Sequence, residues 1–454
     1  MIQARGLKTA AAAMVLICSG AAAKVTPEQA ARLGKDLTPN GAEVAGNKDG
    51  SIPKWTGGYT LPAPARSEMR KLSAAPLLSK DKPLVTITAA NMAQYKGQLT
   101  AGHEALLKRF PGTYKMNVYP TRRTASLPAD IAEATRKNAE TAELANGGES
   151  LLNAVTGTPF PIPASALEVL WNHKVRYRGL SLRRYNTQLA VQTNGDFQPF
   201  KLEEDVRFQY SFPNQTTADL ANVIIYFLQN TKSPARQAGS VLLVHETMDQ
   251  IAEARRAWLY NPGQRRVRRA PNVAYDNPGN GSDGLRTNDQ LDGFNGASDR
   301  YTWKLLGKRE MIVPYNAQLL VQDTLKYKQM ALKGHLNPEL TRYEKHRVWV
   351  LEANLKPGTS HIYKKRFFYV DEDTWSIVHT DMYDSRGALW RVQEEHQVNL
   401  PWSQRSGPVC GTSYDLQSGR YLLMNLSNEE PLFEDREFPI EYYASSNMAK
   451  VSGR

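Results

Sequence analysis

The chain has 454 residues, of which 41% are hydrophobic and 22% charged, and its formal net charge is +12 at pH 7. These proportions describe a folded protein with a sizeable core and exclude an intrinsically disordered chain. Two cysteines are too few for a disulfide framework or a cysteine-based metal site. The length allows two or three average domains, or one large β domain with extensions.

Residues 1–23 predict a secretory leader, with a positive start, an apolar run over 9–19 and a small-residue site for cleavage after Ala23. The apolar run is too short to span a bilayer, and we expect no transmembrane segment in the mature chain. Cleavage removes two positive charges and no acidic residue, which leaves a net charge of +10 and Cys410 as the single thiol. We therefore expect a periplasmic protein. A lipid anchor on Cys18 is the alternative.

The N-terminal part predicts an irregular arm and several helices. The sequence Thr26-Pro27-Glu28-Gln29 is a capping box that opens a short helix. Residues 40–64 are rich in Gly, Pro and Asn and predict an arm laid over an apolar surface. Longer helices are expected at Ala89–Arg109 and Ala129–Ala145, and a short one at Ala166–His173.

After Pro163, hydrophobic residues alternate with polar ones and predict strands. The expected strands are Val175–Tyr185, Val206–Phe212, Asn222–Gln229, Val241–Glu246, Arg255–Tyr260, Gln264–Arg269, Tyr301–Leu305, Tyr343–Glu352, Ile362–Val370, Trp375–Tyr383 and Ala388–Gln397. Short turns join the last three, so these neighbours must be antiparallel. We predict an α+β, mostly β fold: a large curved antiparallel sheet in 151–454, covered by helices and the arm of 24–150, with 24–454 as one structural unit.

The stretch Ala257–Lys304 predicts a hairpin followed by a long loop. The turn at Asn261-Pro262-Gly263-Gln264 is expected to need a positive φ at Gly263. The loop that follows has about 25 residues rich in Gly, Asn, Asp and Ser, and a loop of this length is usually functional or disordered.

Two ligand motifs in this loop fail on their context. Gly279–Gly284 matches the G-x-G-x-x-G pattern of dinucleotide-binding sites, but no predicted strand precedes it and no helical pattern follows. A calcium loop beginning at Asp276 would place Pro278 and Thr287 where ligands belong. An irregular cation site remains open, built from the aspartates Asp276, Asp283, Asp289, Asp292 and Asp299.

Catalytic motifs are missing from the sequence. Ser150 lacks the second glycine of a nucleophile elbow. His245-Glu246 lacks the partner histidine of a zinc-protease helix, and the eight histidines are scattered without ligand spacing. We therefore predict no catalytic residue, no metal and no cofactor.

Basic and aromatic side chains offer candidate ligand contacts. Arg265, Arg266, Arg268 and Arg269 form the densest basic cluster. Export removes nucleic acid as a partner, so the cluster faces anionic lipid head groups, an acidic ligand or an acidic protein. Pairing with the aspartates of the loop is an equal alternative. The candidate ligand-binding residues are Trp171, Arg176, Tyr177, Arg178, Trp258, Tyr260, Arg266 and Arg268, although the aromatic ones can equally be core.

Several segments resemble one known family: TPNGAEVAGNKDGSIPKWTGG (38–58), WNHKVRYRG (171–179), the stretches 258–308 and 346–394, and YDLQSGRY (414–421). The family is the domain-of-unknown-function family thirteen twenty-nine, grouped with the outer-membrane lipoprotein-sorting (LolA/LolB-like) proteins. The resemblance covers nearly the whole mature chain. It implies an incomplete, strongly curved β-barrel closed by helices around a hydrophobic cavity, as in LolA and LolB, which carry acyl chains. It also implies, as partners, an RND-type inner-membrane transporter and an outer-membrane β-barrel protein.

The expected function is that of a periplasmic binding or carrier protein for a lipid-like or hydrophobic ligand. A hydrolase of hydrophobic esters that uses the loop carboxylates, and a structural envelope adaptor, are the alternatives. The loop with Asp276, Asp283, Asp289 and Asp299 is expected to gate the cavity or dock a partner. Deletion of Pro278–Asn295 would then leave the fold intact.

Overall fold

The structure is a computed structural model that describes residues 25–65, 68–69, 77–270 and 275–453. The predicted leader, its cleavage site and Cys18 lie outside the described residues. Within the described ranges, no helix combines the length and the apolar character needed to cross a membrane.

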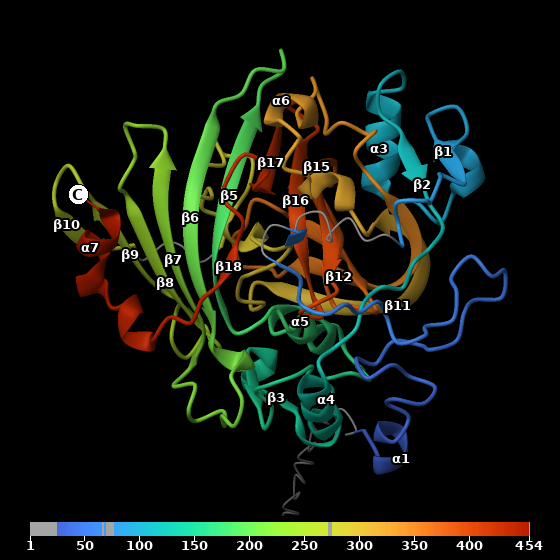
Figure 1. Cartoon of the computed structure of the whole chain (residues 1–454), viewed down its shortest axis with the longest axis horizontal. Helices are drawn as coiled ribbons and strands as arrows, with labels where there is room; N and C mark the ends of the chain where they lie inside the picture. Colours follow the sequence, from blue (N-terminus) through green and yellow to red (C-terminus); the bar gives the residue numbers. More distant parts are fainter. Residues whose placement is uncertain (1–24, 66–67, 70–76, 271–274, 454) are drawn as a thin grey trace, which may run out of the picture.

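One large sheet dominates the fold (Figure 1). Its strands are β1 (Val85–Ile87), β2 (Met116–Val118), β5 (Ser181–Val191), β6 (Pro199–Phe208), β7 (Val223–Ser233), β8 (Val241–Thr247), β9 (Arg256–Asn261), β10 (Arg266–Arg269), β11 (Tyr301–Pro314), β12 (Tyr343–Leu355), β13 (Lys365–Asp371), β14 (Ile377–Tyr383), β15 (Leu389–Leu400), β16 (Arg405–Asp415), β17 (Tyr421–Leu426) and β18 (Glu434–Asp435). They follow in the order β1-β2-β12-β13-β14-β15-β16-β17-β5-β6-β7-β8-β9-β10, while β11 pairs with β12 and β18 with β5. A separate pair, β3 (Glu143–Ala145) and β4 (Ser150–Leu152), lies apart from this sheet.

The sheet is strongly curved and is not closed into a barrel, because its path runs from β1 at one edge to β10 at the other. Its pairings are antiparallel except for a short parallel one between β2 and β12. The predicted mostly β fold with a large curved sheet is therefore confirmed, with the correction that the sheet is mixed.

Helices cover the sheet at its ends and edges (Figure 1). They are α1 (Pro27–Ala30), α3 (Ala101–Arg109), α4 (Ala129–Thr141), α5 (Ala166–Lys174), α6 (Tyr327–Met330) and α7 (Met448–Ser452). Short 3-10 turns are η2 (Met92–Tyr95), η3 (Asn146–Gly148), η4 (Gln209–Ser211), η5 (Asn288–Gln290), η6 (Gln318–Val321), η7 (Ile440–Tyr443) and η8 (Ser445–Asn447). The predicted capping box at Thr26 is present at the start of α1.

Several predicted elements have different bounds, and three of them show why. The helix expected at 89–109 is split into η2 and α3, because Gly97 between them has a φ of 87°. The strand expected from Val175 begins only at Ser181, after Gly179 with a φ of 89°. Helix α4 ends at Thr141, and the chain then turns into β3.

Both faces of the central part of the sheet are buried, whereas the edge strand β10 is exposed. On the outer face, α3 and the segment around η6 and α6 cover a core that contains Leu106, Tyr414 and Leu423. Residues 276–299 lie inside the curve of the sheet, where Leu285 packs against Leu422 and Met424 of β17. The face that this segment covers is named the inner face below.

The hairpin of β9 and β10 is present, but its turn differs from the prediction. The register pairs Asn261 with Arg266, so that residues 262–265 connect the strands. The positive φ falls on Arg265, at 50°, and not on Gly263. With four residues in the connection, the left-handed conformation is adopted by Arg265, and Gly263 does not need a positive φ.

Residues 276–299 do not form a surface flap. Gln290 and Phe294 are each 1% exposed, and the side chain of Gln393 on β15 donates to the backbone carbonyl of Gln290 at 3.0 Å. Polar side chains of the sheet thus form hydrogen bonds with the backbone of this segment, although its amino-acid composition is typical of a solvated loop. Deletion of Pro278–Asn295 would remove part of the core, so the expectation that it leaves the fold intact is corrected.

Candidate ligand-binding cavity

Two adjacent cavities lie on the inner face, one beside β5, β15 and β16 and the other between the 276–299 segment and strands β5 to β8. Their volumes are about 180 and 110 Å³. Both are lined by Arg178, Arg184, Asn186 and Phe208, so they form two chambers of one site. We name the larger one the apolar chamber and the smaller one the charged chamber.

The apolar chamber is bounded by β5, β15, β16 and the segment that follows β17. Most of its lining consists of hydrophobic side chains, among them Leu182, Val398, Leu400, Val409, Leu432 and Phe433. Gly407 on β16 also lines it and pairs with Val398 in the sheet. A Cβ atom on Gly407 would meet no atom within 4 Å, so the wall is hollowed at this residue.

The charged chamber has an apolar floor formed by β7 and β8. Ile225 and Phe227 contribute from β7, and Leu242 and Val244 from β8. Residues two apart on a strand point to the same face, which explains how two neighbouring strands place four hydrophobic side chains side by side. Phe294 of the 276–299 segment lines the same chamber.

Two cations that line the charged chamber form no ion pair with any described residue. Lys174, at the end of α5, is 7% exposed, and its Nζ lies 4.2 Å from the centre of the Trp171 ring. Arg286 is 6% exposed and donates from Nη1 to the carbonyl of Thr287 at 3.1 Å. Burial lowers the pKa of Lys174 and that of Arg286. The carboxylates of Glu204, Glu246 and Asp292 also line the chamber, against five cationic side chains. Since a buried cation without a direct ion pair is costly, this excess of cations suits an acidic group.

Arg178, one of the predicted ligand-binding residues, lines both chambers. Its Nη1 lies 2.6 Å from Oδ2 of Asp292, and its guanidinium lies 4.5 Å from the centre of the Phe208 ring. Arg176 contacts the other oxygen of Asp292 at 2.5 Å. One carboxylate therefore serves two arginines, which adds to the excess of positive charge at the site.

The predicted aromatic residues lie elsewhere. Trp171 belongs to the core, where its Nε1 donates to the carbonyl of Gly148 at 2.8 Å. Tyr177 is half-buried beside a different, smaller pocket. Trp258 and Tyr260 face the outer side of β9 and pack in the core beneath the C-terminal segment. These four side chains do not line the two chambers, because strand alternation and core packing turn them away.

The basic hairpin lies on the inner face, at the open edge of the sheet. Arg268 pairs with Leu259, which pairs with Leu242 of the charged chamber. Partners in neighbouring strands point to one face and lie about 5 Å apart, so Arg268 stands about 10 Å from the chamber floor. Leu259 is 48% exposed. Arg266 and Arg268 form no ion pair with described residues, and they extend the floor as a basic rim.

The aspartates of the 276–299 segment do not gather at one place. Asp289 is buried, with His361 Nε2 at 3.0 Å and Arg366 Nη1 at 2.9 Å from its Oδ2. The others have separate partners: Asp276 contacts Arg300, Asp283 contacts Arg420, Asp292 contacts Arg176 and Arg178, and Asp299 accepts from Tyr275. The pairs leave no common cation site in the described part of this segment and exclude pairing of these aspartates with the basic hairpin.

A protonated carboxyl group lies beneath the 276–299 segment. Glu395 on β15 is 3% exposed, and burial raises its pKa to about 8, against the hydrogen bond from Gln393. At neutral pH Glu395 is therefore mostly protonated and adds little negative charge to the inner face.

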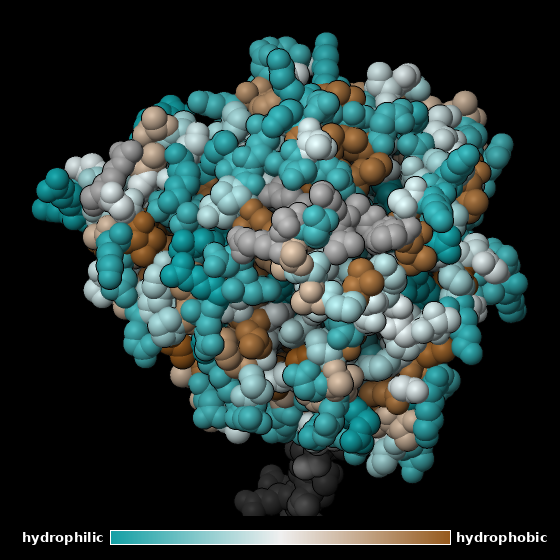
Figure 2. Space-filling model, in the orientation of Figure 1, coloured by the Kyte–Doolittle hydropathy of each residue, from teal (hydrophilic) through white to brown (hydrophobic). Residues whose placement is uncertain are grey.

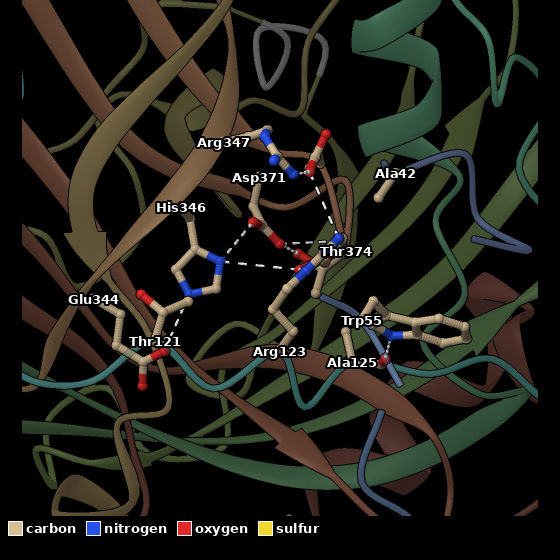
Figure 3. A network of polar contacts seen from close by, with 12 residues as sticks. Ala42, Trp55, Thr121, Arg123, Ala125, Glu344, His346, Arg347, Asp371 and Thr374 are labelled. Atoms are coloured by element: carbon tan, nitrogen blue, oxygen red, sulfur yellow. Dashed lines mark hydrogen bonds and ion pairs between the residues drawn. The ribbon is translucent and has the colours of Figure 1, made fainter. Parts of the chain in front are cut away.

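Two buried groups of side chains have the composition of a metal site, and both lie outside the chambers. One contains His346, Asp371 and Asp373 (Figure 3). Its charge is already balanced, because Arg123 donates to both oxygens of Asp373 at 2.6 and 3.0 Å and His346 lies 3.1 Å from Glu344. This group is an ion-pair network that holds the N-terminal arm. The other group contains His103, His379 and Glu394.

The molecular surface supports an internal site. On the face drawn in Figure 2, hydrophobic residues lie scattered among hydrophilic ones wherever grey atoms do not cover them. The walls of the two chambers bring several apolar side chains together inside the protein.

Sequence comparison places the chain among proteins of unknown activity. The family described as "Protein of unknown function (DUF1329)" matches residues 86–449. An uncharacterized protein of Pseudomonas aeruginosa is 50% identical over 424 residues, which cover 93% of each chain.

Solved structures with a similar arrangement have low sequence identity. A domain from Vibrio parahaemolyticus, described as an outer membrane lipoprotein-sorting protein, is 15% identical and covers 62% of this chain and 97% of its own, with a TM-score of 0.43. A DUF1329 family protein of Desulfovibrio piger is 14% identical, covers 60% and 92%, and has a TM-score of 0.41. A LolA superfamily protein of Nitrosomonas europaea is 14% identical, covers 62% and 98%, and has a TM-score of 0.38.

Proposed function

The chain belongs to the DUF1329 family, and we propose that it is a periplasmic binding or carrier protein for an amphipathic ligand. The ligand has an apolar chain, which occupies the apolar chamber, and an acidic group, which occupies the charged chamber. The observation that carries this proposal is the pair of buried cations, Lys174 and Arg286, that line the charged chamber without an ion-pair partner among the described residues, where cationic side chains outnumber acidic ones.

The size of the chambers suits part of an acyl chain. Each buried methylene contributes about 0.8 kcal/mol, so eight methylenes contribute roughly 6 kcal/mol. A hydrogen bond from a cation to the acidic group adds about 2 kcal/mol. The total is close to that of a micromolar complex, about 8 kcal/mol, before the costs of association are subtracted.

The basic hairpin supplies a route for exchange. Arg266, Arg268 and the exposed Leu259 continue the floor of the charged chamber to the edge of the sheet. We infer that this rim contacts acidic head groups of a membrane leaflet while the ligand enters or leaves. Attraction between basic side chains and anionic lipids amounts to about 1 kcal/mol per residue near the surface.

A hydrolase is a weaker alternative. Its acid and base would have to approach one ester bond, whereas Asp276, Asp283 and Asp299 are bound by different partners at different places. A purely structural adaptor would not explain why Lys174 and Arg286 are buried without an ion-pair partner among the described residues.

Binding of cis-parinaric acid, a fluorescent fatty acid, tests the proposal. We expect saturable binding with a stoichiometry near one per chain and clearly weaker binding of its methyl ester, because the ester has no negative charge. Extraction of protein purified from the periplasm without detergent, followed by mass spectrometry, should yield an acidic lipid-like molecule. If the acid and several other chain lengths fail to bind and the extract is empty, the proposal is refuted, and a co-purified stoichiometric protein would then favour the adaptor.

A further inference from the structure

A second polar cluster lies on the outer face of the sheet, under α3 and away from the cavity. It contains His103 from α3, His379 and Asp381 from β14, and Glu394 and His396 from β15, all of them at most 1% exposed on their side chains. Neighbouring residues of β15, such as Gln393, point to the inner face instead. The cluster is therefore independent of the chambers.

The strand register brings the cluster together. His379 pairs directly with Glu394 across β14 and β15, and residues two apart on a strand share a face. This places Asp381 and His396 on the same face. Helix α3 then adds His103, whose Nε2 lies 3.0 Å from Oε1 of Glu394. One ligand atom from each of His103, His379 and Glu394 lies within 4.8 Å of the other two.

Several polar atoms of the cluster lack a partner. Oε2 of Glu394 and both ring nitrogens of His396 form no hydrogen bond with any described residue. They face each other, with Nε2 of His396 at 3.9 Å from Oε2 of Glu394. Polar groups that are fully buried are nearly always satisfied by protein, water or an ion. Two ligands about 2.1 Å from one tetrahedral ion lie roughly 3.4 Å apart, and the distances of 3.0 and 3.9 Å in the cluster bracket this spacing.

The surroundings of His379 match those of a metal ligand. Its Nε2 lies 2.7 Å from Oδ1 of Asp381 and 2.9 Å from Oγ1 of Thr100. A ligand histidine commonly donates one ring N–H to a carboxylate, which fixes the tautomer and leaves the other nitrogen for the metal. Nδ1 of His379 has no hydrogen-bond partner in the described ranges.

We propose that His103, His379 and Glu394 form a structural binding site for a divalent transition metal, with Zn²⁺ as the best fit and with His396 beside the site, facing Oε2 of Glu394. Imidazole and carboxylate ligands suit Zn²⁺. A site that is closed on all sides by protein is typical of structural and not catalytic zinc. The metal would fasten α3 to β14 and β15, elements that are far apart in the chain.

The test is metal binding by the whole protein. We expect wild-type protein, stripped with a chelator and dialysed against Zn²⁺, to retain one ion per chain, and Co²⁺ in its place to give a visible absorption spectrum. Glu394→Gln, which keeps the size of the side chain similar, should weaken binding at least 100-fold, and His396→Gln, beside the site, should weaken it to a smaller extent. The control is His245→Gln, since His245 lies on β8 and contacts the carbonyl of Tyr443 at 2.9 Å. It should bind as wild type does.

The outcome is decided first on the wild-type protein, so a variant that fails to fold does not obscure it. Retention of fewer than about 0.1 Zn²⁺ or Co²⁺ per chain by folded wild type overturns the proposal and assigns the cluster to buried water. Binding that survives in folded Glu394→Gln and His396→Gln but is lost in His346→Gln overturns it as well, because the ion would then occupy the network of Figure 3.

Discussion

A large side chain introduced on the wall of the apolar chamber should occupy the space of the ligand and abolish binding while the protein still folds. Gly407 lines this chamber, its φ is not in the left-handed region, and a Cβ on it would meet no atom within 4 Å. Gly407→Phe therefore places a ring in the space where we expect the apolar chain. A phenylalanine covers about 150 Å² or more of apolar surface. Loss of that area from the ligand costs roughly 4 kcal/mol at 25 cal/mol per Å², which is about a thousandfold weaker binding.

The assay is a fluorescence titration with cis-parinaric acid, run beside thermal unfolding. Stability should stay the same or rise slightly, because the substitution fills a cavity and removes the conformational freedom of a glycine in a strand. The matched control is Gly112→Phe, since Gly112 also has open space around its Cβ position and lies outside both chambers. Undiminished binding by folded Gly407→Phe would refute the assignment of the chain to this chamber.

Three further predictions concern charge. Arg286→Met should weaken cis-parinaric acid binding about tenfold to a hundredfold, the equivalent of one charge-assisted hydrogen bond, and should leave binding of the methyl ester unchanged. The double variant Arg266→Glu and Arg268→Glu should lose sedimentation with vesicles that contain phosphatidylglycerol, whereas Arg136→Glu on α4 should not. Glu395→Gln should flatten the pH dependence of stability: the folded pKa of about 8 lies above the ordinary glutamate value of 4.5, so the free energy of unfolding falls as pH rises from about 4.5 to 8, by on the order of 5 kcal/mol.

Each of these has a contrary result. Equal losses for acid and ester in Arg286→Met would mean that Arg286 only supports the cavity wall. Vesicle binding that does not change with salt concentration would exclude an electrostatic role for the hairpin. A steeper fall in stability above pH 5 for Glu395→Gln than for wild type would show that another group titrates.

The sequence was a good guide wherever local pattern decides structure. The meander from β12 to β15 was predicted because alternating residues and short acidic turns such as Asp371-Glu372-Asp373 specify it locally. Strands β16 and β17 were missed. Strand β16 contains Gly407, Pro408 and Gly411, which argue against a strand, and the register shift beside Pro408 accommodates them.

The candidate site was predictable only in part. Arg178 stood out because it lies in a distinctive basic and aromatic segment. Lys174 and Arg286 did not, because their importance lies in the partners that they lack, which only the tertiary structure reveals. The burial of residues 276–299 was likewise hidden, since their composition is that of a solvated loop and the groups that satisfy their backbone come from β15 and β16.

The histidine cluster under α3 was not predicted from the sequence, also because its residues come together only in the tertiary structure. His103 and Glu394 are 291 residues apart in sequence, so no local ligand spacing exists between them. The pairs His379 with Asp381 and Glu394 with His396 did carry a signal, because each repeats with the period of a strand. That signal becomes meaningful only once β14 and β15 are known to be neighbours.

A crystal structure with a fatty acid brominated at the end of its chain tests the central claim most directly. We predict an anomalous bromine peak inside the apolar chamber, near Gly407 and Val398, and the carboxylate within hydrogen-bond distance of Arg286 or Lys174. A peak on the surface, or one in neither chamber while the acid remains bound in solution, would contradict the account.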